Sequence, residues 1–406
     1  MFVPRTIYAG SEDMGRTVAV IGGGYGGAAV AKALDQDTDV VLIESKDAFV
    51  HSAGSLRALV RPDWAGNMFF PYDRLLQRGK VVRERAASVD PGGVTLASGE
   101  RVDADYLVLA SGSDYPFPAK MDTDLSSEAL ESLRAAHAEL ASADRVLITG
   151  AGPVGLELSG EIKAVWPDKS VTIVDPAGRL VPGFLPEMRE DLHRQLDALK
   201  VELRLGTTLT EEPPTEPGRA KTFTIGTTGG EVTADIWFRC HGVSVNGHYL
   251  GDGLVTTRTP QGRVRVTETL KVDGHDHIYA LGDITDLAEA KMAGHAMRHA
   301  EVVAENIIAQ VRGERPTAVY RPSPVPSILL PLGPSGGVGQ VPSPDGPAVL
   351  PAQAVSEYKG ADLFIGRFTE LFGRTPTGAR TEAPTEAPNG ASTDDGPDHR
   401  TDSRTP

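Results

Sequence analysis

The sequence predicts an α/β fold built from two doubly wound units, with the second unit inserted in the first and a separate C-terminal segment after them. Two observations carry this prediction. A glycine-rich turn with the spacing G-x-G-x-x-G follows an apolar stretch at residues 18–27 and again at residues 145–155. In both places a helix-like stretch comes next, followed by a second apolar stretch that ends in an acidic residue. Strands and helices that alternate in this order are typical of parallel sheets covered by helices.

The glycine turn of the first unit has the chemistry of a Rossmann-like dinucleotide-binding site. Its first glycine permits a tight turn, the second lets the backbone approach a pyrophosphate, and the third lets the helix pack closely on the strand. The pyrophosphate then lies at the helix N-terminus, where unpaired N–H groups favour negative charge. An acid at the end of the next apolar stretch is placed to bind ribose hydroxyls. The predicted first site therefore comprises Gly22, Gly24, Tyr25, Gly26, Gly27 and Glu44, with Val82 from a short strand and Ser111 and Gly112 where the buried strand 105–113 breaks.

The second unit repeats this design. Gly150, Gly152 and Gly155 have the same spacing, and Pro153 lies at the start of the helix. Asp175 takes the place that the acid has in the first unit. A carboxylate there favours a free ribose 2′-hydroxyl and repels a 2′-phosphate, so NADH is expected, although the nearby Arg179 leaves NADPH open. Two such sites predict two bound cofactors and a relay between them.

Length and composition restrict the classes of function. The chain has 406 residues, too many for one compact core, and a net charge of −15, which argues against a nucleic-acid partner. No apolar run approaches the roughly 20 residues that a membrane-spanning helix needs. The first 16 residues lack the apolar core of a signal peptide, so a cytoplasmic location is expected by default. No metal site is expected.

The order of the motifs resembles one superfamily. After the first glycine turn come LASGS at 109–113, GAGPVGLE at 150–157 and IYALGD at 278–283. This order resembles the pyridine nucleotide-disulfide oxidoreductases, flavoproteins with two dinucleotide sites. The resemblance implies FAD in the first unit and NAD(P)H in the second. It also implies that Asp283 binds the ribityl or pyrophosphate part of FAD.

The chain departs from the disulfide-containing members of that superfamily at the redox disulfide. Those members carry a cysteine pair shortly after the first acid, whereas this region reads FVHSAGSLRA and the chain has one cysteine, Cys240. Hydride that reaches the flavin therefore cannot pass to a protein dithiol and has to leave for an external acceptor. The branches that remain are quinone reductases, ferredoxin reductases and relatives of apoptosis-inducing factor.

Further stretches resemble the FAD-dependent NAD(P)H:quinone oxidoreductases among the relatives of apoptosis-inducing factor. These stretches are KDAFVHSAGSLRALV at 46–60, GLELSGEIKAVWPDKSVTIV at 155–174, KMA at 291–293, GGVGQ at 336–340 and the neighbourhood of residue 359. The resemblance implies that Glu44 binds the FAD ribose and that His51 and Arg57 lie near the flavin. It implies that Glu157 lies between the nicotinamide and the isoalloxazine and that Lys359 approaches the flavin from the C-terminal segment. It also implies that Lys291 and Met292 contact the pyrimidine end of the flavin. The predicted catalytic residues are Glu157, His51, Lys291 and Lys359.

Two positions depart from this branch as well. The start of the chain is not a myristoylation site, and Gly294 stands where the family has an aromatic residue after Lys-Met-Ala. Near the C-terminal end, Phe364, Phe368 and Phe372 recur at helical spacing. We expect this stripe to pack against the body of the protein or a second subunit; a lip for a quinone or a membrane surface is the alternative.

The motifs divide the chain into five parts. The last part has almost no large apolar side chains and is expected to be disordered. The predicted parts are a leader at 1–15, an FAD-binding domain at 16–120 and 252–320, an NAD(P)H-binding domain at 121–251, a C-terminal segment at 321–373 and a disordered tail at 374–406.

The expected reaction transfers hydride from NADH, or NADPH, to FAD and then two electrons to a quinone-like acceptor. One alternative is an NADH:ferredoxin-type reductase that serves an oxygenase. Another is an NADH-responsive flavoprotein with an interaction role, in which reduction changes dimerisation. A third is oxidation of a small metabolite without a nicotinamide step. A homodimer and peripheral contact with a membrane stay open.

Overall fold

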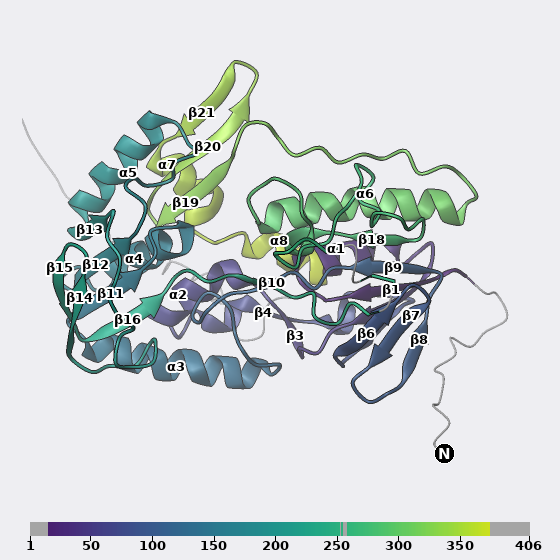
Figure 1. The fold of residues 1–406 in the computed structure, drawn as a ribbon, viewed down its shortest axis with the longest axis horizontal. Coiled ribbons are helices and arrows are strands. Elements are labelled where there is room, and N and C mark those ends of the chain that lie inside the picture. Colours follow the sequence, from purple (N-terminus) through teal and green to yellow (C-terminus); the bar gives the residue numbers. More distant parts are fainter. Residues whose placement is uncertain (1–14, 252, 255–257, 374–406) are drawn as a thin grey trace, which may run out of the picture.

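The computed structural model describes residues 15–251, 253–254 and 258–373. The predicted leader, apart from Gly15, and the predicted tail lie outside the described residues. The chain forms two lobes side by side, each built on a parallel sheet (Figure 1). The described helices include none that is both long enough and apolar enough to cross a membrane.

The first lobe contains a five-stranded parallel sheet with the order β18-β9-β1-β2-β5. Val18 and Val20 of β1 face helices α1 and α6, whereas Ala19 and Ile21 face a small antiparallel sheet, β6-β7-β8. This alternation of side chains explains why the strands are apolar throughout. The bounds are β1 (Thr17–Ile21), β2 (Asp39–Ile43), β5 (Lys80–Val82), β6 (Ala86–Asp90), β7 (Gly93–Leu96), β8 (Arg101–Asp103), β9 (Tyr106–Leu109), β18 (Ile278–Ala280), α1 (Tyr25–Leu34) and α6 (Ala293–Val311).

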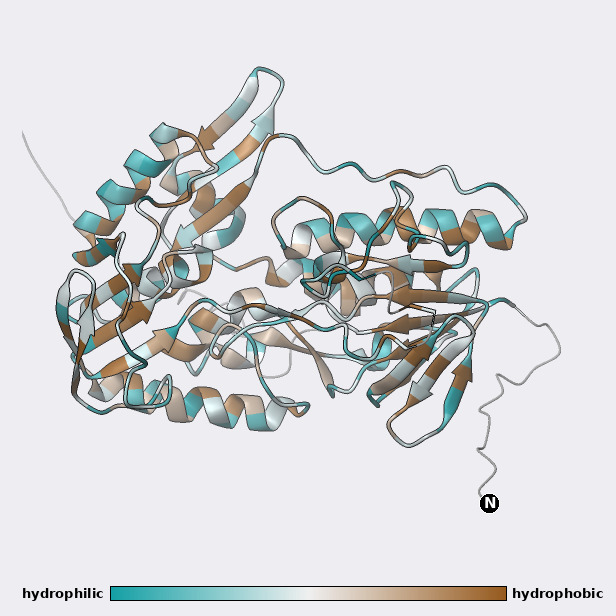
Figure 2. Cartoon of the chain, viewed as in Figure 1, coloured by the Kyte–Doolittle hydropathy of each residue, from teal (hydrophilic) through white to brown (hydrophobic). Residues whose placement is uncertain are grey.

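The second lobe contains a four-stranded parallel sheet with the order β13-β12-β11-β16. Val146 and Ile148 of β11 pack in the same core as α3, α4 and α5, and Leu147 packs against the hairpin β14-β15. In Figure 2 the strands of both parallel sheets are hydrophobic, while hydrophilic residues mark the outer faces of the helices. The bounds are β11 (Arg145–Thr149), β12 (Ser170–Asp175), β13 (Val201–Leu205), β14 (Phe223–Thr227), β15 (Gly230–Ala234), β16 (Ile236–Arg239), α3 (Ser126–Ser142), α4 (Pro153–Val165) and α5 (Pro186–Ala198).

The second lobe is inserted in the first. The chain leaves the first sheet after β9 and returns to it with β18, which pairs directly with β9. The outgoing strand β10 (Ser113–Asp114) and the returning strand β17 (Ser244–Val245) pair with each other where the chain crosses between the lobes. The predicted fold class, two Rossmann-like domains with one inserted in the other, is confirmed.

A C-terminal segment completes the fold. A three-stranded antiparallel sheet, β19-β20-β21, lies beside the second lobe, and α8 returns to the first lobe (Figure 1). These strands lie in a stretch rich in proline and glycine for which we predicted no strands. The bounds are β19 (Ile328–Leu332), β20 (Gly336–Ser343), β21 (Gly346–Leu350), α7 (Ala352–Val355), the π-helical turn η6 (Ser356–Gly360) and α8 (Ile365–Phe372).

The expected packing of the phenylalanine stripe is confirmed for two of its three members. Phe368 and Phe372 are buried against Phe49 and Phe70 of the first lobe, whereas Phe364 is 37% exposed. The short elements β3 (Ala48–Val50), β4 (Phe69–Pro71) and the 3₁₀ turn η3 (Tyr72–Arg74) flank this cluster, whereas α2 (Ser55–Val60) packs against α3 and α4 of the second lobe. The 3₁₀ turns η1 (Ser52–Gly54) and η2 (Ala65–Met68) contact α2 and each other.

Candidate active site

The two glycine turns have the same geometry. Gly22 and Gly150 have left-handed backbone angles, with φ of +99° and +106°. A Cβ on Gly27 would lie 1.8 Å from the carbonyl oxygen of Gly22, and a Cβ on Gly155 would lie 2.0 Å from that of Gly150. The first and third glycines are therefore required by the protein itself.

At the second glycine of each turn, no described part of the protein would clash with an added Cβ atom. A Cβ on Gly24 or Gly152 would meet no atom within 4 Å. Both residues are helix N-caps without a side-chain cap, and neither helix has an acid in its first turn, so the N–H groups there are available to an anion. Space beside the turn, together with free donors, fits the pyrophosphate of a dinucleotide in both units.

Each glycine turn and the acid after it form a nucleotide-binding cradle, with residues 22–27 and Glu44 in the first and residues 150–155 and Asp175 in the second. The Glu44 carboxylate accepts hydrogen bonds from the N–H groups of Gly23, at 2.6 Å, and Lys46, at 2.9 Å. The Asp175 carboxylate accepts from Ala151 at 2.6 Å and from the N–H two residues further along the chain at 2.7 Å. In both units the carboxylate is thus fixed at the glycine turn, where a ribose would lie. The residues fit FAD in the first unit and NAD(P)H in the second.

Three further predicted residues lie at the carboxyl end of the first sheet. The carbonyl of Val82 accepts the N–H of Glu44 at 3.0 Å. Ser111 donates to the carbonyl of Asn246 at 2.6 Å, so its hydroxyl joins the two crossing segments between the lobes. Gly112 has a φ of +65° and open space around its Cβ position.

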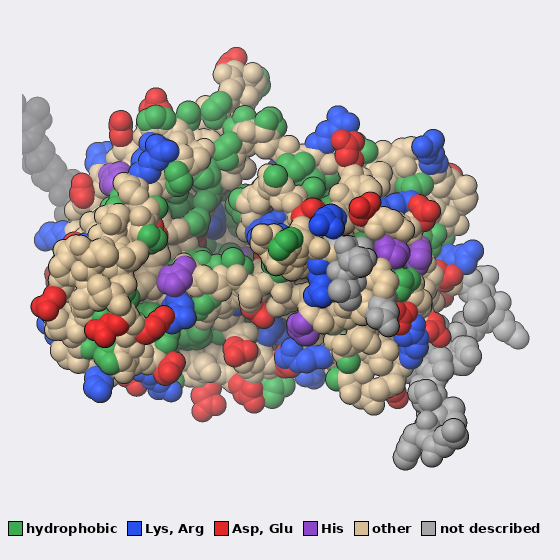
Figure 3. All heavy atoms as spheres, viewed as in Figure 1, with side chains coloured by type: hydrophobic (Ala, Val, Ile, Leu, Met, Phe, Trp, Pro, Cys, Tyr) green, Lys and Arg blue, Asp and Glu red, His purple; other side chains and the backbone are tan. Residues whose placement is uncertain are grey.

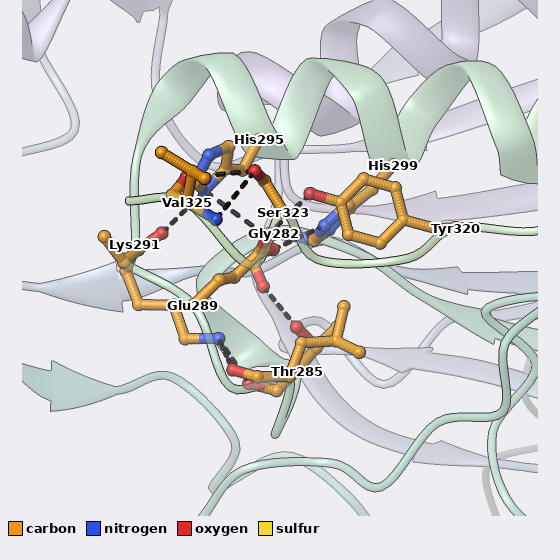
Figure 4. A network of polar contacts seen from close by, with 11 residues as sticks. Gly282, Thr285, Glu289, Lys291, His295, His299, Tyr320, Ser323 and Val325 are labelled. Carbon is orange, nitrogen blue, oxygen red and sulfur yellow. Dashed lines mark hydrogen bonds and ion pairs between the residues drawn. The ribbon is translucent and has the colours of Figure 1, made fainter. Parts of the chain in front are cut away.

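The Gly282-Asp283 turn, η5 (Gly282–Ile284), is held by a buried chain of hydrogen bonds (Figure 4). The N–H of Gly282 donates to Nδ1 of His299 at 3.0 Å, so Nε2 carries the proton and donates to Glu289 at 2.8 Å. Tyr320 donates to the other carboxylate oxygen of Glu289 at 2.6 Å. Burial lowers the pKa of His299 to about 4 and keeps it neutral. The roles of Glu289 and Tyr320 were not predicted.

The side chain of Asp283 points to the crossing between the lobes. It accepts a hydrogen bond from the hydroxyl of Ser113 at 2.6 Å, and the ammonium of Lys120 donates to the backbone carbonyl of Ser113. Neither Ser113 nor Lys120 was predicted as a site residue. Burial lowers the pKa of Lys120, while Asp283 opposes that shift.

Lys291 and Met292 lie at the N-terminus of α6. The Lys291 ammonium donates to the carbonyls of Thr285 and Leu287, each at 3.0 Å, so in this structure it braces the turn that follows Asp283 (Figure 4). Burial lowers the pKa of Lys291. Met292 is the N-cap of α6, and its carbonyl accepts the first helical hydrogen bonds.

The predicted catalytic residues Glu157 and Lys359 form an ion pair. Nζ of Lys359 lies 2.8 Å from Oε1 of Glu157 and also donates to the carbonyl of Leu329 at 3.0 Å. Both side chains are largely buried. Burial raises the pKa of Glu157, and the Lys359 ammonium opposes that shift. The pair joins the nucleotide-binding helix α4 to the turn η6.

His51 is buried and neutral. Its Nε2–H donates to the carbonyl of Leu363 at 2.6 Å, which leaves Nδ1 to accept from the hydroxyl of Tyr25 at 3.0 Å. Burial lowers the pKa of His51 to about 4. Both ring nitrogens are therefore engaged, and the side chain ties α1 to the C-terminal segment.

Arg57 forms a second tie to the C-terminal segment. Its guanidinium contacts Oε1 of Glu161 on α4 at 2.7 Å and 3.0 Å and donates to the carbonyls of Gly360 and Ala361. In this structure its donors are thus taken up largely by protein. Glu161 was not predicted, although its position four residues after Glu157 places both acids on one side of α4.

Cys240 takes no part in a redox pair. It is the one cysteine of the chain and is buried, and burial raises the pKa of its thiol to about 12. A buried thiol of this kind is inert. FAD, when bound, supplies the electron chemistry by taking hydride from a nicotinamide and releasing electrons to an acceptor.

The two cradles, together with the single buried cysteine, define an FAD-dependent NAD(P)H oxidoreductase without a redox disulfide. The family model for pyridine nucleotide-disulphide oxidoreductases matches residues 16–305, and the chain belongs to this family. Ferroptosis suppressor protein 1 of Taeniopygia guttata is 32% identical over 90% of this chain and 98% of its own length. Apoptosis-inducing factor homolog B of Dictyostelium discoideum is 30% identical over 87% and 96%.

A solved structure shows the same fold. The sulfide:quinone oxidoreductase of Aquifex aeolicus superposes with a TM-score of 0.70 at 19% identity, covering 89% of this chain and 92% of that one. The family match, rather than this structural likeness, confirms the assignment of FAD and NAD(P)H.

Proposed function

We propose that this protein is an NADH:quinone oxidoreductase, in which hydride from NADH is passed by way of FAD to a quinone-type acceptor as two electrons. The observation that carries the proposal is the ion pair of Glu157 and Lys359. It joins the helix that receives the nicotinamide nucleotide to a segment that reaches the FAD-binding lobe. The only cysteine lies outside any dithiol, so the acceptor has to come from outside.

The protein residues orient the nucleotide and supply charge. The N-terminus of α4 binds the pyrophosphate, and Asp175 accepts hydrogen bonds from the ribose hydroxyls. Reduction of a quinone to a quinol takes up two electrons and two protons. The Lys359 ammonium is placed to stabilise the negative charge that develops on a quinone oxygen.

The surface next to Lys359 favours an apolar acceptor. Tyr358 is 62% exposed and Phe364 is 37% exposed, and both belong to the segment that carries Lys359. Figure 3 shows a hollow between the two lobes with hydrophobic side chains around it. Exposed aromatic side chains suit a quinone ring, whereas docking of an acidic iron–sulfur protein calls for a basic face.

A screen of acceptors tests the proposal. NADH and NADPH are supplied in parallel to the FAD-loaded protein with a short-chain ubiquinone, a menaquinone analogue, a ferredoxin or oxygen. We expect the highest turnover with NADH and a quinone. Turnover with ferredoxin alone contradicts the proposal. Slow reoxidation by every quinone, together with a change in sedimentation caused by NADH, supports the interaction role instead.

A further inference from the structure

We propose that Arg57 is a positioning residue for Lys359. Together with His51 it holds the backbone of residues 360–363, and this keeps the Lys359 ammonium on Glu157. The inference rests on the proposed function only in that the ion pair takes part in the reaction. The contacts that hold the segment are independent of the acceptor.

The contacts of Arg57 are directed at the residues next to Lys359. Nη2 donates to the carbonyl of Gly360 at 2.6 Å, and Nη1 donates to that of Ala361 at 2.9 Å. Nε and Nη2 also donate to Oε1 of Glu161. The Arg57 and Glu161 side chains are 3% and 5% exposed. One planar guanidinium thus joins α2, α4 and the C-terminal segment, a geometry that a lysine cannot reproduce.

The backbone of the held segment is unusual. Lys359 lies in a single π-helical turn, a feature frequent at functional sites. Leu363 and Phe364, neither of them glycine, have φ of +56° and +65°. Such angles persist only where surrounding contacts enforce them. The hydrogen bond from His51 to the carbonyl of Leu363 is one such contact.

Arg57 also determines which carboxylate pairs with Lys359. Glu157 and Glu161 lie one turn apart on α4, and Glu161 raises the pKa of Glu157 while Arg57 lowers it. The second carboxylate oxygen of Glu161 is buried and makes no hydrogen bond within the described chain. Without Arg57, Lys359 would therefore face two buried carboxylates instead of one. Arg57 neutralises Glu161 and leaves Lys359 to pair with Glu157.

Hydrogen exchange and kinetics on FAD-loaded Arg57→Met and Arg57→Lys test the inference. The matched control is Lys163→Met. Like Arg57, Lys163 is a buried cation that donates to two backbone carbonyls, those of Pro167 and Lys169, but it lies on α4. We expect R57M to speed amide exchange in residues 356–364 and to lower kcat about tenfold or more with little change in the KM for NADH. R57K is expected to fall between R57M and wild type, and K163M to match wild type.

A double variant separates positioning from general destabilisation. Adding R57M to Lys359→Met should leave kcat unchanged from K359M alone, because the residue being positioned is already gone. Multiplying effects, or exchange in 356–364 that R57M and R57K leave unchanged, would overturn the inference. If R57M does not fold, exchange in R57K and in His51→Gln decides. Lack of quinone turnover by the wild type defeats the proposed function, whereas the exchange result still decides the holding role.

Discussion

Nζ of Lys359 lies 2.8 Å from Oε1 of Glu157, although 202 residues separate them in the sequence. The glutamate comes from the helix whose N-terminus forms the second nucleotide cradle, and the lysine comes from the π-helical turn η6 of the C-terminal segment. The contact therefore fixes the C-terminal segment to the second lobe.

Removal of either member of the ion pair should slow catalysis while FAD stays bound. We expect Glu157→Gln and Lys359→Met to lower the rate of flavin reduction or quinone turnover by roughly 10- to 100-fold, because each leaves its buried partner uncompensated. Stopped-flow absorbance of the flavin measures both half-reactions. Glu190→Gln on the exposed side of α5 is the control. Wild-type rates in both pair variants contradict the role of the pair.

Substitution of the second glycine should weaken nucleotide binding, whereas substitution of the third should destabilise the fold. Gly24→Ala and Gly152→Ala place a methyl group in open space, so we expect folded proteins with weaker retention of FAD and a higher KM for NADH, respectively. Gly27→Ala drives its methyl into the Gly22 carbonyl and should cost about 1–3 kcal/mol of stability or more. Flavin content and urea unfolding measure these effects. Gly183→Ala, which also enters open space, is the neutral control. Full FAD retention by G24A contradicts the first cradle.

Asp175 should set the preference for NADH. We expect Asp175→Asn to raise the ratio of kcat/KM for NADPH to that for NADH by about tenfold or more, because the repulsion between the carboxylate and the 2′-phosphate is lost. The exposed Arg179 is then free to attract that phosphate. Asp197→Asn makes the same change of charge on the exposed side of α5. An unchanged ratio in D175N shows that the ribose lies elsewhere.

Two buried histidines should make the protein less stable in mild acid. Burial lowers the pKa of His51 and of His299 to about 4, below the ordinary value of 6.5. Between these values the unfolded chain binds protons that the folded chain does not, so the free energy of unfolding falls as the pH drops from 6.5 towards 4. Each histidine adds up to about 1.4 kcal/mol per pH unit to that slope.

Urea unfolding at a series of pH values, with FAD in fixed excess, measures this slope. We expect His51→Gln and His299→Gln each to reduce it. His241→Gln, at an exposed position, should leave it unchanged. Equal slopes in all four proteins would show that the buried histidines are not held neutral.

The parts of the site that sequence predicts are local in the chain. The two glycine turns and the acids after them follow from spacing within about 30 residues, because one strand-turn-helix-strand unit fixes their geometry. The same reasoning predicted the doubly wound domains. It could not predict β19, β20 and β21, because proline and glycine interrupt the alternation of apolar residues that indicates strands in residues 328–350.

The contacts that could not be predicted join distant parts of the chain. Arg57 meets Glu161 across 104 residues, and His51 meets Leu363 across 312. The first pair depends on how α2 packs against α4 and the second on where the C-terminal segment lies, and no local pattern encodes either. Resemblance alone placed His51 and Arg57 near the flavin; their contacts show ties to the C-terminal segment. The one signal in the sequence was the spacing of Glu157 and Glu161, four residues apart on α4. Two acids on one side of a helix call for cations from other parts of the chain, here Lys359 and Arg57.

An anaerobic titration follows hydride entry from NADH and electron exit to a quinone in one experiment. The protein as purified is first reduced with NADH and then mixed with a short-chain quinone while the flavin absorbance is followed. We expect one equivalent of NADH to bleach the flavin and one equivalent of quinone to restore its colour in wild type, and the colour to return far more slowly in K359M. A colourless protein that binds no added FAD, or a reduced flavin that no quinone reoxidises, would contradict the proposed function.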